Sequence, residues 1–310
     1  WLSMMYPRLK LARNLLRDDG VIFVSIGQDE ISNLKNICDE IYGEVNCVGV
    51  CSRQMKSGSN QGKHFSTNID YVLVYAKSIT SLPEFRERLS ENLIKKVYTQ
   101  IQEIGDRKGE RYRTMGLYQS SLEDRINQRF WIKCPDDSYC LPPGESLPIK
   151  IEEGAKIIPK AREGVWRWTY DRYAQELKND NIEFKKTKDS PLIDENGNKS
   201  SWNIYTKIWL KDRQAEGKLP NDLITKFENR HSSKEIQELK IPFDFAKPVG
   251  LIKFLIEISK VNDNDIVLDF FGGSSTSAHS VFSWNSEMKK SIKFILVQLP
   301  ETIDVKSKAY

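Results

Sequence analysis

Long apolar runs are missing from this sequence of 310 residues, and none approaches the ~18 residues that a membrane-spanning helix needs. We therefore do not expect a membrane protein. Internal repeats and low-complexity tracts are missing as well. A hydrophobic fraction of 39% and a mean hydropathy of −0.53 are typical of a soluble protein with much polar surface. The length is enough to bury a sizeable core in one large domain or in two.

Histidine and cysteine are scarce. The chain has three histidines and five cysteines, an odd number scattered along the sequence. This pattern favours free thiols in a reducing cytoplasm over a disulfide framework. The spacings of Cys47 with Cys51 and of Cys134 with Cys140 could suit metal half-sites, but no histidine stands at ligand spacing from either pair. We therefore predict no metal site.

Charge of one sign is not in large excess. A net charge of +4 and a pI of 8.6 are compatible with a polyanionic partner but too small to establish one, so the basic residues that bind it must cluster. The connection 52–66 is rich in Gly, Ser, Asn and Lys and predicts a mobile loop. Arg53, Lys56 and Lys63 could contact phosphate there. A solvated basic loop without a role is the alternative interpretation.

The first 77 residues show the pattern of an α/β domain. Leucines at helical spacing follow Pro7, and a glycine turn at Gly20 is expected to stop this helix. The apolar run Val21–Ile26 is typical of a strand covered on both faces, and a second helix is predicted from about Asp29 to Tyr42. Helix, strand and helix predict a parallel α/β unit. Two further strands are expected, at 45–51 and 71–76.

A strand-to-helix turn near the other end of the chain carries the strongest local signal. The apolar run Ile266–Leu268 ends at Asp269, and the small residues 272–275 precede a helix-compatible segment. Free backbone N–H groups at a helix start favour polar or anionic ligand groups, so a nucleotide-like cofactor is a natural occupant. An ordinary turn of a parallel α/β domain explains the glycines equally well.

The middle of the chain has a different character. From residue 78 to about 240, charged helices predicted at 84–103, a proline-containing polar stretch and short aromatic-basic segments replace the buried strands. This change predicts a separate inserted domain. One segment, 162–170, mixes aromatic and basic side chains, so Trp166 and Trp168 could stack on bases beside Arg162 and Arg167. Alternatively, the two tryptophans alternate into a small core with Arg167 pointing outward.

Three sequence blocks resemble those of one known family. They are Phe243-Asp-Phe-Ala-Lys-Pro-Val-Gly, Asp269-Phe-Phe-Gly-Gly-Ser-Ser-Thr and Gln298-Leu-Pro-Glu301. In this order they resemble the S-adenosylmethionine pocket of the DNA amino-methyltransferases that serve as modification subunits of type III restriction-modification systems. The opening block Trp1-Leu-Ser-Met-Met-Tyr-Pro-Arg-Leu and the segment Val165-Trp-Arg-Trp168 resemble the same family, the latter in its target-recognition domain.

The resemblance implies a fold, a reaction and a set of partners. The fold is α/β, a circularly permuted S-adenosylmethionine-dependent methyltransferase with a Rossmann-like doubly wound sheet and an inserted α+β target-recognition domain. The two methyltransferase halves are then residues 1–77 and 241–310, with the recognition domain at 78–240. The reaction is methyl transfer to adenine N6 in double-stranded DNA. A homodimer and a restriction (helicase-nuclease) subunit are the expected partners.

The same resemblance implies roles in the cofactor pocket. Asp269 would accept hydrogen bonds from the amino-acid end of S-adenosylmethionine, while Phe270 or Phe271 would lie at cation–π range of the sulfonium. Lys247 would pair with the donor's carboxylate, and Gln298 or Glu301 would bind the ribose hydroxyls. Ser275 stands where many relatives have glycine, so a positive φ there would cost about 1 kcal/mol. The expected cofactor contacts are Lys247, Pro248, Asp269, Phe270, Phe271, Gly272, Gly273, Ser274, Ser275, Thr276, Gln298 and Glu301.

The catalytic tetrapeptide of the family, Asp-Pro-Pro-Tyr, is absent from these 310 residues. We therefore predict no catalytic residue in this chain, and we expect a fragment open at both ends. The strand that carries the motif would lie between the two halves, so the fragment alone should be marginally stable and inactive. A DNA-binding remnant that does not methylate, or one that pairs with a restriction subunit, is the alternative. A nicotinamide dehydrogenase is disfavoured because no Gly-x-Gly-x-x-Gly follows the predicted strand.

Overall fold

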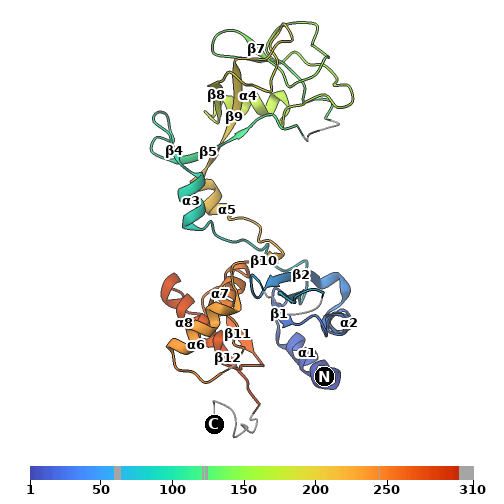
Figure 1. Cartoon of the computed structure of the whole chain (residues 1–310), viewed down its shortest axis with the longest axis vertical. Helices are drawn as coiled ribbons and strands as arrows, with labels where there is room; N and C mark the ends of the chain where they lie inside the picture. Colours follow the sequence, from blue (N-terminus) through green and yellow to red (C-terminus); the bar gives the residue numbers. More distant parts are fainter. Residues whose placement is uncertain (59–63, 121, 123–124, 244, 300–310) are drawn as a thin grey trace. The chain divides into compact units, whose positions relative to one another are not determined.

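The computed structural model describes residues 1–58, 64–120, 122, 125–243 and 245–299 (Figure 1). The chain divides into two compact units. Unit 1 combines residues 1–87 with the segment that begins at Lys218, and unit 2 is Arg88–Gly217. Within the described part of the chain, no helix is long and apolar enough to cross a membrane.

The first segment of unit 1 builds most of a four-stranded sheet with the order β1-β3-β2-β10. Antiparallel pairing joins β1 to β3 and β3 to β2, whereas β2 and β10 are parallel. Its elements are α1 (Leu2–Leu15), β1 (Val21–Ile26), α2 (Ile31–Tyr42), the 3-10 helix η1 (Glu44–Asn46), β2 (Cys47–Gln54) and β3 (Ile69–Ala76), to which the later β10 (Leu223–Ile224) is added.

Two expectations for this segment were wrong. The first helix does not begin after Pro7 but runs through it, because Met5 and Leu9 on either side are buried in the same core. The parallel unit is not formed, since β1 has the antiparallel β3 as its neighbour, with Val21 opposite Ala76. Strand β3 follows β2 and lies between it and β1, which produces the antiparallel pairing.

Apolar clusters cover both faces of this sheet. On one face, Leu9 of α1 and Leu34 of α2 pack against Leu73 of β3, and Ile22 and Val24 of β1 join them. On the other face, the helix α7 (Val249–Ile258) packs with Phe23 of β1 and Ile224 of β10, through Leu251, Leu255 and Ile258. The prediction that the strand Val21–Ile26 is covered on both faces is confirmed.

The second segment of unit 1 is a parallel strand-helix-strand unit preceded by two helices. These are α6 (Asn229–Glu238), α7, β11 (Ile266–Asp269), α8 (Thr276–Met288) and β12 (Lys293–Leu296). Strands β11 and β12 pair in parallel, with Asp269 opposite Leu296. Ile256 of α7 packs with Val281 and Trp284 of α8 in a shared core. The predicted strand, turn and helix around Asp269 are confirmed.

Within the described residues, β1 pairs only with β3 and β11 pairs only with β12, so each strand has an open edge. Contacts join the two segments beside these edges. Arg17 Nη1, before β1, lies 2.6 Å from Asp265 Oδ1, before β11. At the opposite ends of the strands, Phe270 packs against the cluster that contains Leu9.

Unit 2 is built on an antiparallel sheet with the order β4-β5-β9-β8. Alternation along β9 places Trp202 and Ile204 in a core with Phe130, Trp166 and Tyr173. The elements are α3 (Glu91–Val97), β4 (Gln100–Ile101), β5 (Arg111–Gly116), β6 (Ile132–Lys133), β7 (Tyr139–Cys140), α4 (Tyr170–Lys178), β8 (Ile182–Lys186), β9 (Trp202–Trp209) and α5 (Leu210–Glu216).

The prediction of charged helices at 84–103 was wrong in extent, because one helix, α3, and the strand β4 lie in this range. Helix α3 begins only after Ser90, whose hydroxyl accepts a hydrogen bond from Leu93 N at 3.3 Å and caps the helix. Before this cap, Glu87 is extended and forms a β-bridge with Lys218. After the helix, Gln100–Ile101 joins the sheet, so charge content alone did not reveal these boundaries.

Candidate functional site

The Asp269 carboxylate stabilises the turn between β11 and α8 through two hydrogen bonds. Its Oδ1 accepts a hydrogen bond from Phe271 N at 3.0 Å, and its Oδ2 accepts one from Ser277 Oγ at 2.6 Å. The carboxylate thus joins the start of the turn to the first turn of α8. Because a carboxylate offers about four lone-pair sites, each oxygen can accept one more donor.

Two residues of the turn have left-handed backbone. Gly273 has φ of 50° and Ser275 has φ of 62°. The glycine tolerates this conformation, but the serine carries the cost of about 1 kcal/mol expected for a residue with a Cβ. A Cβ on Gly273 would lie 3.3 Å from Phe243 Cζ, so this aromatic ring lies over the turn. Phe243 belongs to the first block of the resemblance, but its side chain was not among the predicted contacts.

The end of β12 closes the turn from the other side. Gly272 N donates to Val297 O at 3.0 Å, and Val297 N donates to Asp269 O at 2.8 Å. Gln298 Oε1 accepts a hydrogen bond from Gly273 N at 2.9 Å. Gln298 therefore lies at the predicted site as a contact of the turn itself. Glu301 lies outside the described residues.

Lys247 is brought to the turn from the segment before α7. Pro248 caps α7, and Lys247 O accepts a hydrogen bond from Thr276 Oγ1 at 3.3 Å. With Ser274, Ser275 and Thr276, Lys247 lines a pocket of about 310 Å³. Helix α6 contributes Glu235, Ile236 and Leu239 to the same pocket, and α8 contributes Ala278, His279 and Phe282.

An ion pair lies behind Lys247. Its Nζ donates to Asp70 Oδ2 at 2.8 Å, and Asp70 also accepts two hydrogen bonds from Arg53, at 2.7 and 2.5 Å. Burial alone would raise the pKa of Asp70, but the hydrogen bonds from Arg53 and Lys247 outweigh it and hold the pKa below its ordinary value. Arg53 has 0% exposed surface, so its predicted contact with DNA is wrong. Lys56 is exposed, and Lys63 lies outside the described residues.

The two phenylalanines of the turn have different surroundings. Phe270 is half-buried against the core of α1 and α2, whereas Phe271 has 44% of its surface exposed. The Arg8 guanidinium lies 5.9 Å from the centre of the Phe271 ring, at cation–π range. Phe271 is therefore the more exposed of the two rings, and one cation already lies near it. Sequence patterns did not reveal Arg8, because its contact crosses between the two segments of unit 1.

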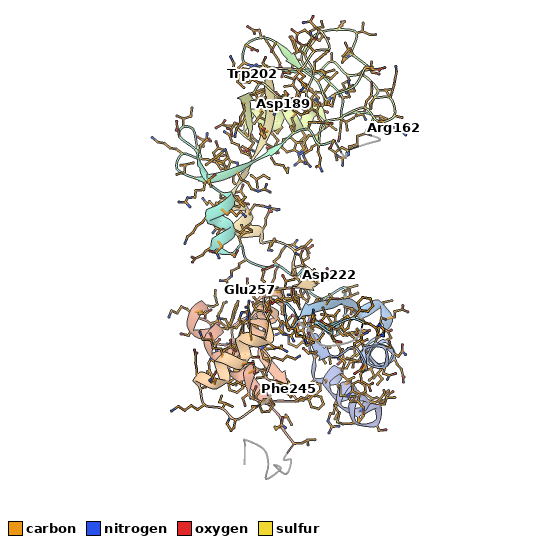
Figure 2. All side chains as sticks on the ribbon, in the orientation of Figure 1. Arg162, Asp189, Trp202, Asp222, Phe245 and Glu257 are labelled. Carbon is orange, nitrogen blue, oxygen red and sulfur yellow. The ribbon has the colours of Figure 1, made fainter. Side chains whose placement is uncertain are left out.

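The predicted DNA contacts of unit 2 divide between its core and its surface. Trp166 is fully buried and donates from Nε1 to Phe130 O at 2.8 Å, so its predicted stacking on bases is wrong and the core alternative holds for it. Trp168 is half-buried, with the Arg172 guanidinium 4.6 Å from its ring centre. Arg167 Nε donates to Gly116 O at 2.8 Å. Arg162 is exposed (Figure 2).

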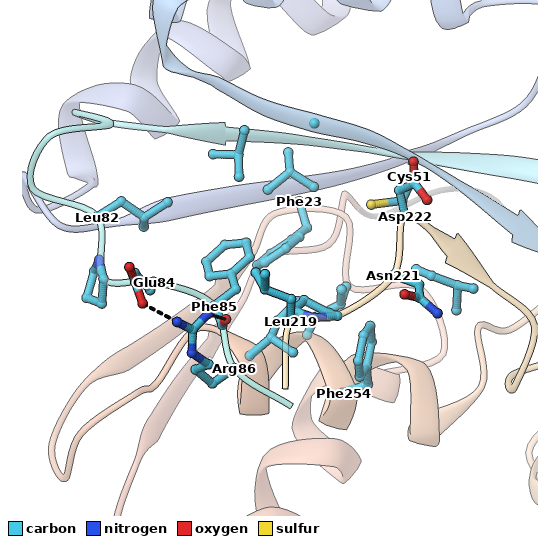
Figure 3. A pocket seen from close by; sticks show the side chains of 18 of the residues that line it. Phe23, Cys51, Leu82, Glu84, Phe85, Arg86, Leu219, Asn221, Asp222 and Phe254 are labelled. Atoms are coloured by element: carbon cyan, nitrogen blue, oxygen red, sulfur yellow. Dashed lines mark hydrogen bonds and ion pairs between the residues drawn. The ribbon is translucent and has the colours of Figure 1, made fainter. Parts of the chain in front are cut away.

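A second pocket of unit 1, of about 490 Å³, contains none of the predicted site residues. Figure 3 shows Phe23, Phe85, Leu219 and Phe254 around it, with the ion pair of Glu84 and Arg86 at its wall. Its lining is mainly apolar, and it lies on the α7 face of the sheet rather than at the turn. In the part of the chain that the structure describes, no three His, Cys, Asp or Glu side chains gather as metal ligands.

The fold and the site define a mixed α/β protein with a glycine-containing turn between a parallel strand and a helix. The chain belongs to the DNA methylase family, whose sequence profile matches residues 1–286. The predicted resemblance to type III modification subunits is confirmed by its relatives.

Over 334 aligned residues the chain is 30% identical to the type III restriction-modification enzyme EcoP15I Mod subunit of Escherichia coli, covering 100% of this chain and 48% of that protein. It is 28% identical to the EcoPI Mod subunit of Escherichia phage P1, covering 100% of this chain and 47% of the relative. It is 27% identical to the type II methyltransferase M.KpnI of Klebsiella pneumoniae, covering 96% of this chain and 66% of that protein. The chain thus spans about half the length of the type III relatives it matches.

Proposed function

We propose that this chain is part of a DNA methyltransferase that transfers a methyl group from S-adenosylmethionine to adenine N6 within a restriction-modification system. The observation that carries the proposal is the Asp269 turn beside Lys247, in a chain of the DNA methylase family. Adenine as the target rests on the resemblance to type III modification subunits.

The residues at the turn fit the proposed cofactor. An ammonium group has three donors, and Asp70 occupies one donor of Lys247, so two remain for the carboxylate of the proposed cofactor. Asp269 retains acceptor capacity for an amino group, and the exposed ring of Phe271 suits a sulfonium. S-adenosylmethionine, when bound, supplies an electrophilic methyl group. The chain's own residues hold and orient that donor.

The open edges of β1 and β11 support the proposed permuted sheet. A strand bearing the Asp-Pro-Pro-Tyr motif, which is absent from these residues, would pair with both edges and bring the catalytic groups to Phe271. The ion pair of Arg17 with Asp265 already links the segments that lead into the two strands. Residues 1–77 and 241–310 are then the methyltransferase halves.

Unit 2, Arg88–Gly217, is the proposed target-recognition domain, and it lies within the predicted insert 78–240. Exposed Arg162 and half-buried Arg167 and Trp168 supply cations and a partly accessible aromatic surface for double-stranded DNA. Lys56 adds a cation from the loop of unit 1. The target base must leave the duplex to reach a methyl donor. A homodimer and a restriction subunit complete the proposed assembly, as the names of the Mod relatives suggest.

Methyl transfer by the complete protein tests this function. The protein, expressed with the coding sequence upstream of Trp1, is mixed with tritium-labelled S-adenosylmethionine and DNA of mixed sequence. We expect label in DNA that digests to N6-methyladenine, and none with the 310-residue chain alone. Label in the cytosine fraction would contradict adenine as the target, and transfer by the 310-residue chain would contradict the missing-strand proposal.

A DNA-binding protein without methyltransferase activity is the second candidate, because the described site contains no Asp-Pro-Pro-Tyr motif. The codons upstream of Trp1 distinguish the two. An in-frame Asp-Pro-Pro-Tyr within a few tens of residues supports the enzyme. Its absence, together with DNA binding and no label transfer, supports the binding protein.

A further inference from the structure

Asp70 is a buried anion between two cations of different exposure. Arg53 holds it with two hydrogen bonds, from Nε to Oδ1 at 2.7 Å and from Nη2 to Oδ2 at 2.5 Å. The same Oδ2 accepts a hydrogen bond from Lys247 Nζ at 2.8 Å. Asp70 has 4% of its surface exposed, and Arg53 has none. A bidentate guanidinium fixes the plane of a carboxylate, so Oδ2 has one orientation.

Arg53 is itself held from several sides. Its Nη1 donates to Phe227 O at 2.9 Å, and its Nη2 also donates to Asn229 Oδ1 at 3.1 Å. Arg53 of β2 stands directly opposite Asp70 of β3 in the antiparallel ladder. The pair is therefore part of the sheet, and it provides a rigid anchor for a third group.

Lys247 is the most exposed member of this arrangement. Its side chain has 36% of its surface exposed, and a four-carbon stem loses considerable rotamer entropy when its ammonium is fixed. Its backbone is tied to the turn through Thr276 Oγ1. Asp70 accepts one hydrogen bond from the ammonium, which leaves two of its three donors for a ligand beside this partly exposed side chain. Glu235, the acid of the pocket that Lys247 lines, accepts a hydrogen bond from Val249 N at 3.1 Å.

We propose that Asp70 is a positioning residue for cofactor binding, which holds the Lys247 ammonium ready for the carboxylate of S-adenosylmethionine. This inference rests on the proposed function. Asp70 itself lies behind Lys247 and acts through it. Removing the negative charge of Asp70 frees the lysine to adopt other rotamers, so the ligand must order it on binding and the affinity falls.

Isothermal titration calorimetry on the complete protein tests the inference with two probes, S-adenosylhomocysteine and its decarboxylated analogue. The variants are Asp70→Asn, Lys247→Met and the two combined. We expect each single variant to bind S-adenosylhomocysteine about tenfold more weakly. The double variant should bind no more weakly than Lys247→Met alone, because Asp70 has no effect once the ammonium is gone. Neither single variant should change the affinity for the analogue without a carboxylate.

Two results would overturn the positioning role. One is an additive loss of affinity in the double variant, and the other is an equal loss for both probes with Asp70→Asn, as general disruption of the fold would produce. A wild-type protein that binds neither probe contradicts the proposed function instead. The two failures are thereby distinguished.

Further variants guard against a loss of structure. Asp70→Asn leaves the buried charge of Arg53 less compensated, so a second pair, Arg53→Met with Asp70→Leu, removes both charges and fills the space with apolar groups. In this double variant, the affinity for S-adenosylhomocysteine relative to that for the decarboxylated probe should fall about tenfold from the wild-type ratio. Unchanged preference in this folded pair contradicts the inference. Lys253→Met on α7, which removes an ion pair with Glu287, is the matched lysine control and should leave both affinities unchanged.

Discussion

Ser277 Oγ lies 2.6 Å from Asp269 Oδ2 and donates a hydrogen bond to it across the turn that links β11 to α8. The bond joins a strand end to a helix that begins only one residue earlier, at Thr276. The tight turn of the proposed cofactor site is therefore held by a side-chain contact as well as by its glycines. The contact can be removed without altering the backbone.

Replacing Ser277 with alanine is expected to lower the free energy of unfolding by about 1–2 kcal/mol, because Asp269 loses a donor in a half-buried position. Urea unfolding of the complete protein measures this loss. Ser277→Thr keeps the hydroxyl and is the control, with a smaller expected effect. Equal stability of Ser277→Ala and the wild type would show that water replaces the serine.

Ser275 allows a test of backbone strain. Since its φ is 62°, Ser275→Gly should be at least as stable as the wild type, whereas Ser275→Val should lose about 1–2 kcal/mol because a β-branched residue is disfavoured in the left-handed region. Thermal unfolding by calorimetry compares the two. A valine variant as stable as the glycine variant would contradict the left-handed conformation.

Removing the charge of Arg53 should lower the stability of the protein, whereas removing the charge of Lys56 should change its DNA binding. Arg53→Leu is expected to cost about 3–5 kcal/mol of stability, because Asp70 remains buried with Lys247 alone. Lys56→Ala should leave stability unchanged but reduce the salt dependence of DNA binding by about one phosphate contact. Chemical unfolding and fluorescence anisotropy with a DNA duplex at several salt concentrations measure the two effects. A stable Arg53→Leu variant with weakened DNA binding would restore the original prediction for Arg53.

Substitutions of the two tryptophans in the predicted recognition segment should have different effects on stability and on DNA binding. Trp166→Ala removes a fully buried ring and is expected to cost about 3–5 kcal/mol, with loss of the Unit 2 core. Trp168→Ala, at a half-buried position, should cost less and should weaken DNA binding. Unfolding curves and duplex binding distinguish them. Weaker DNA binding by a fully folded Trp166→Ala variant would contradict its assignment to the core.

The acid sensitivity of unit 1 follows from Asp70. Its folded pKa lies below the ordinary value of 3.8, so the unfolded state binds more protons between the two values. Its contribution is complete above pH 3.8 and is lost as the pH falls through the lower, folded pKa. We expect the free energy of unfolding to decrease with acidification in that window, and the decrease to be shallower in Asp70→Asn. Urea unfolding at a series of pH values measures this dependence. If the free energy of unfolding changed equally with pH in the wild type and in Asp70→Asn, Asp70 would not be the cause of the acid sensitivity.

Local patterns predicted the strand, the turn and the helix around Asp269, because apolar period and small residues act over a few positions. They also located the blocks that identify the family. They did not locate the short elements near Glu87, where Ser90 capping and pairing with the distant Lys218 set the boundaries. Strand pairing with distant partners is set by tertiary packing rather than by local propensity.

The sequence by itself determined the family, the turn after Asp269 and the position of Lys247 along the chain, since each depends on residues that are neighbours in sequence. Only the tertiary structure decided that Arg53 is buried and that Lys247 contacts Asp70, which is 177 residues away. Composition gives a lysine and an arginine the same charge and a similar preference for the surface. Arg53 is buried because β3 places Asp70 opposite it and because Phe227 O and Asn229 Oδ1 accept its other donors, whereas Lys247 reaches the same carboxylate with a side chain that stays partly exposed.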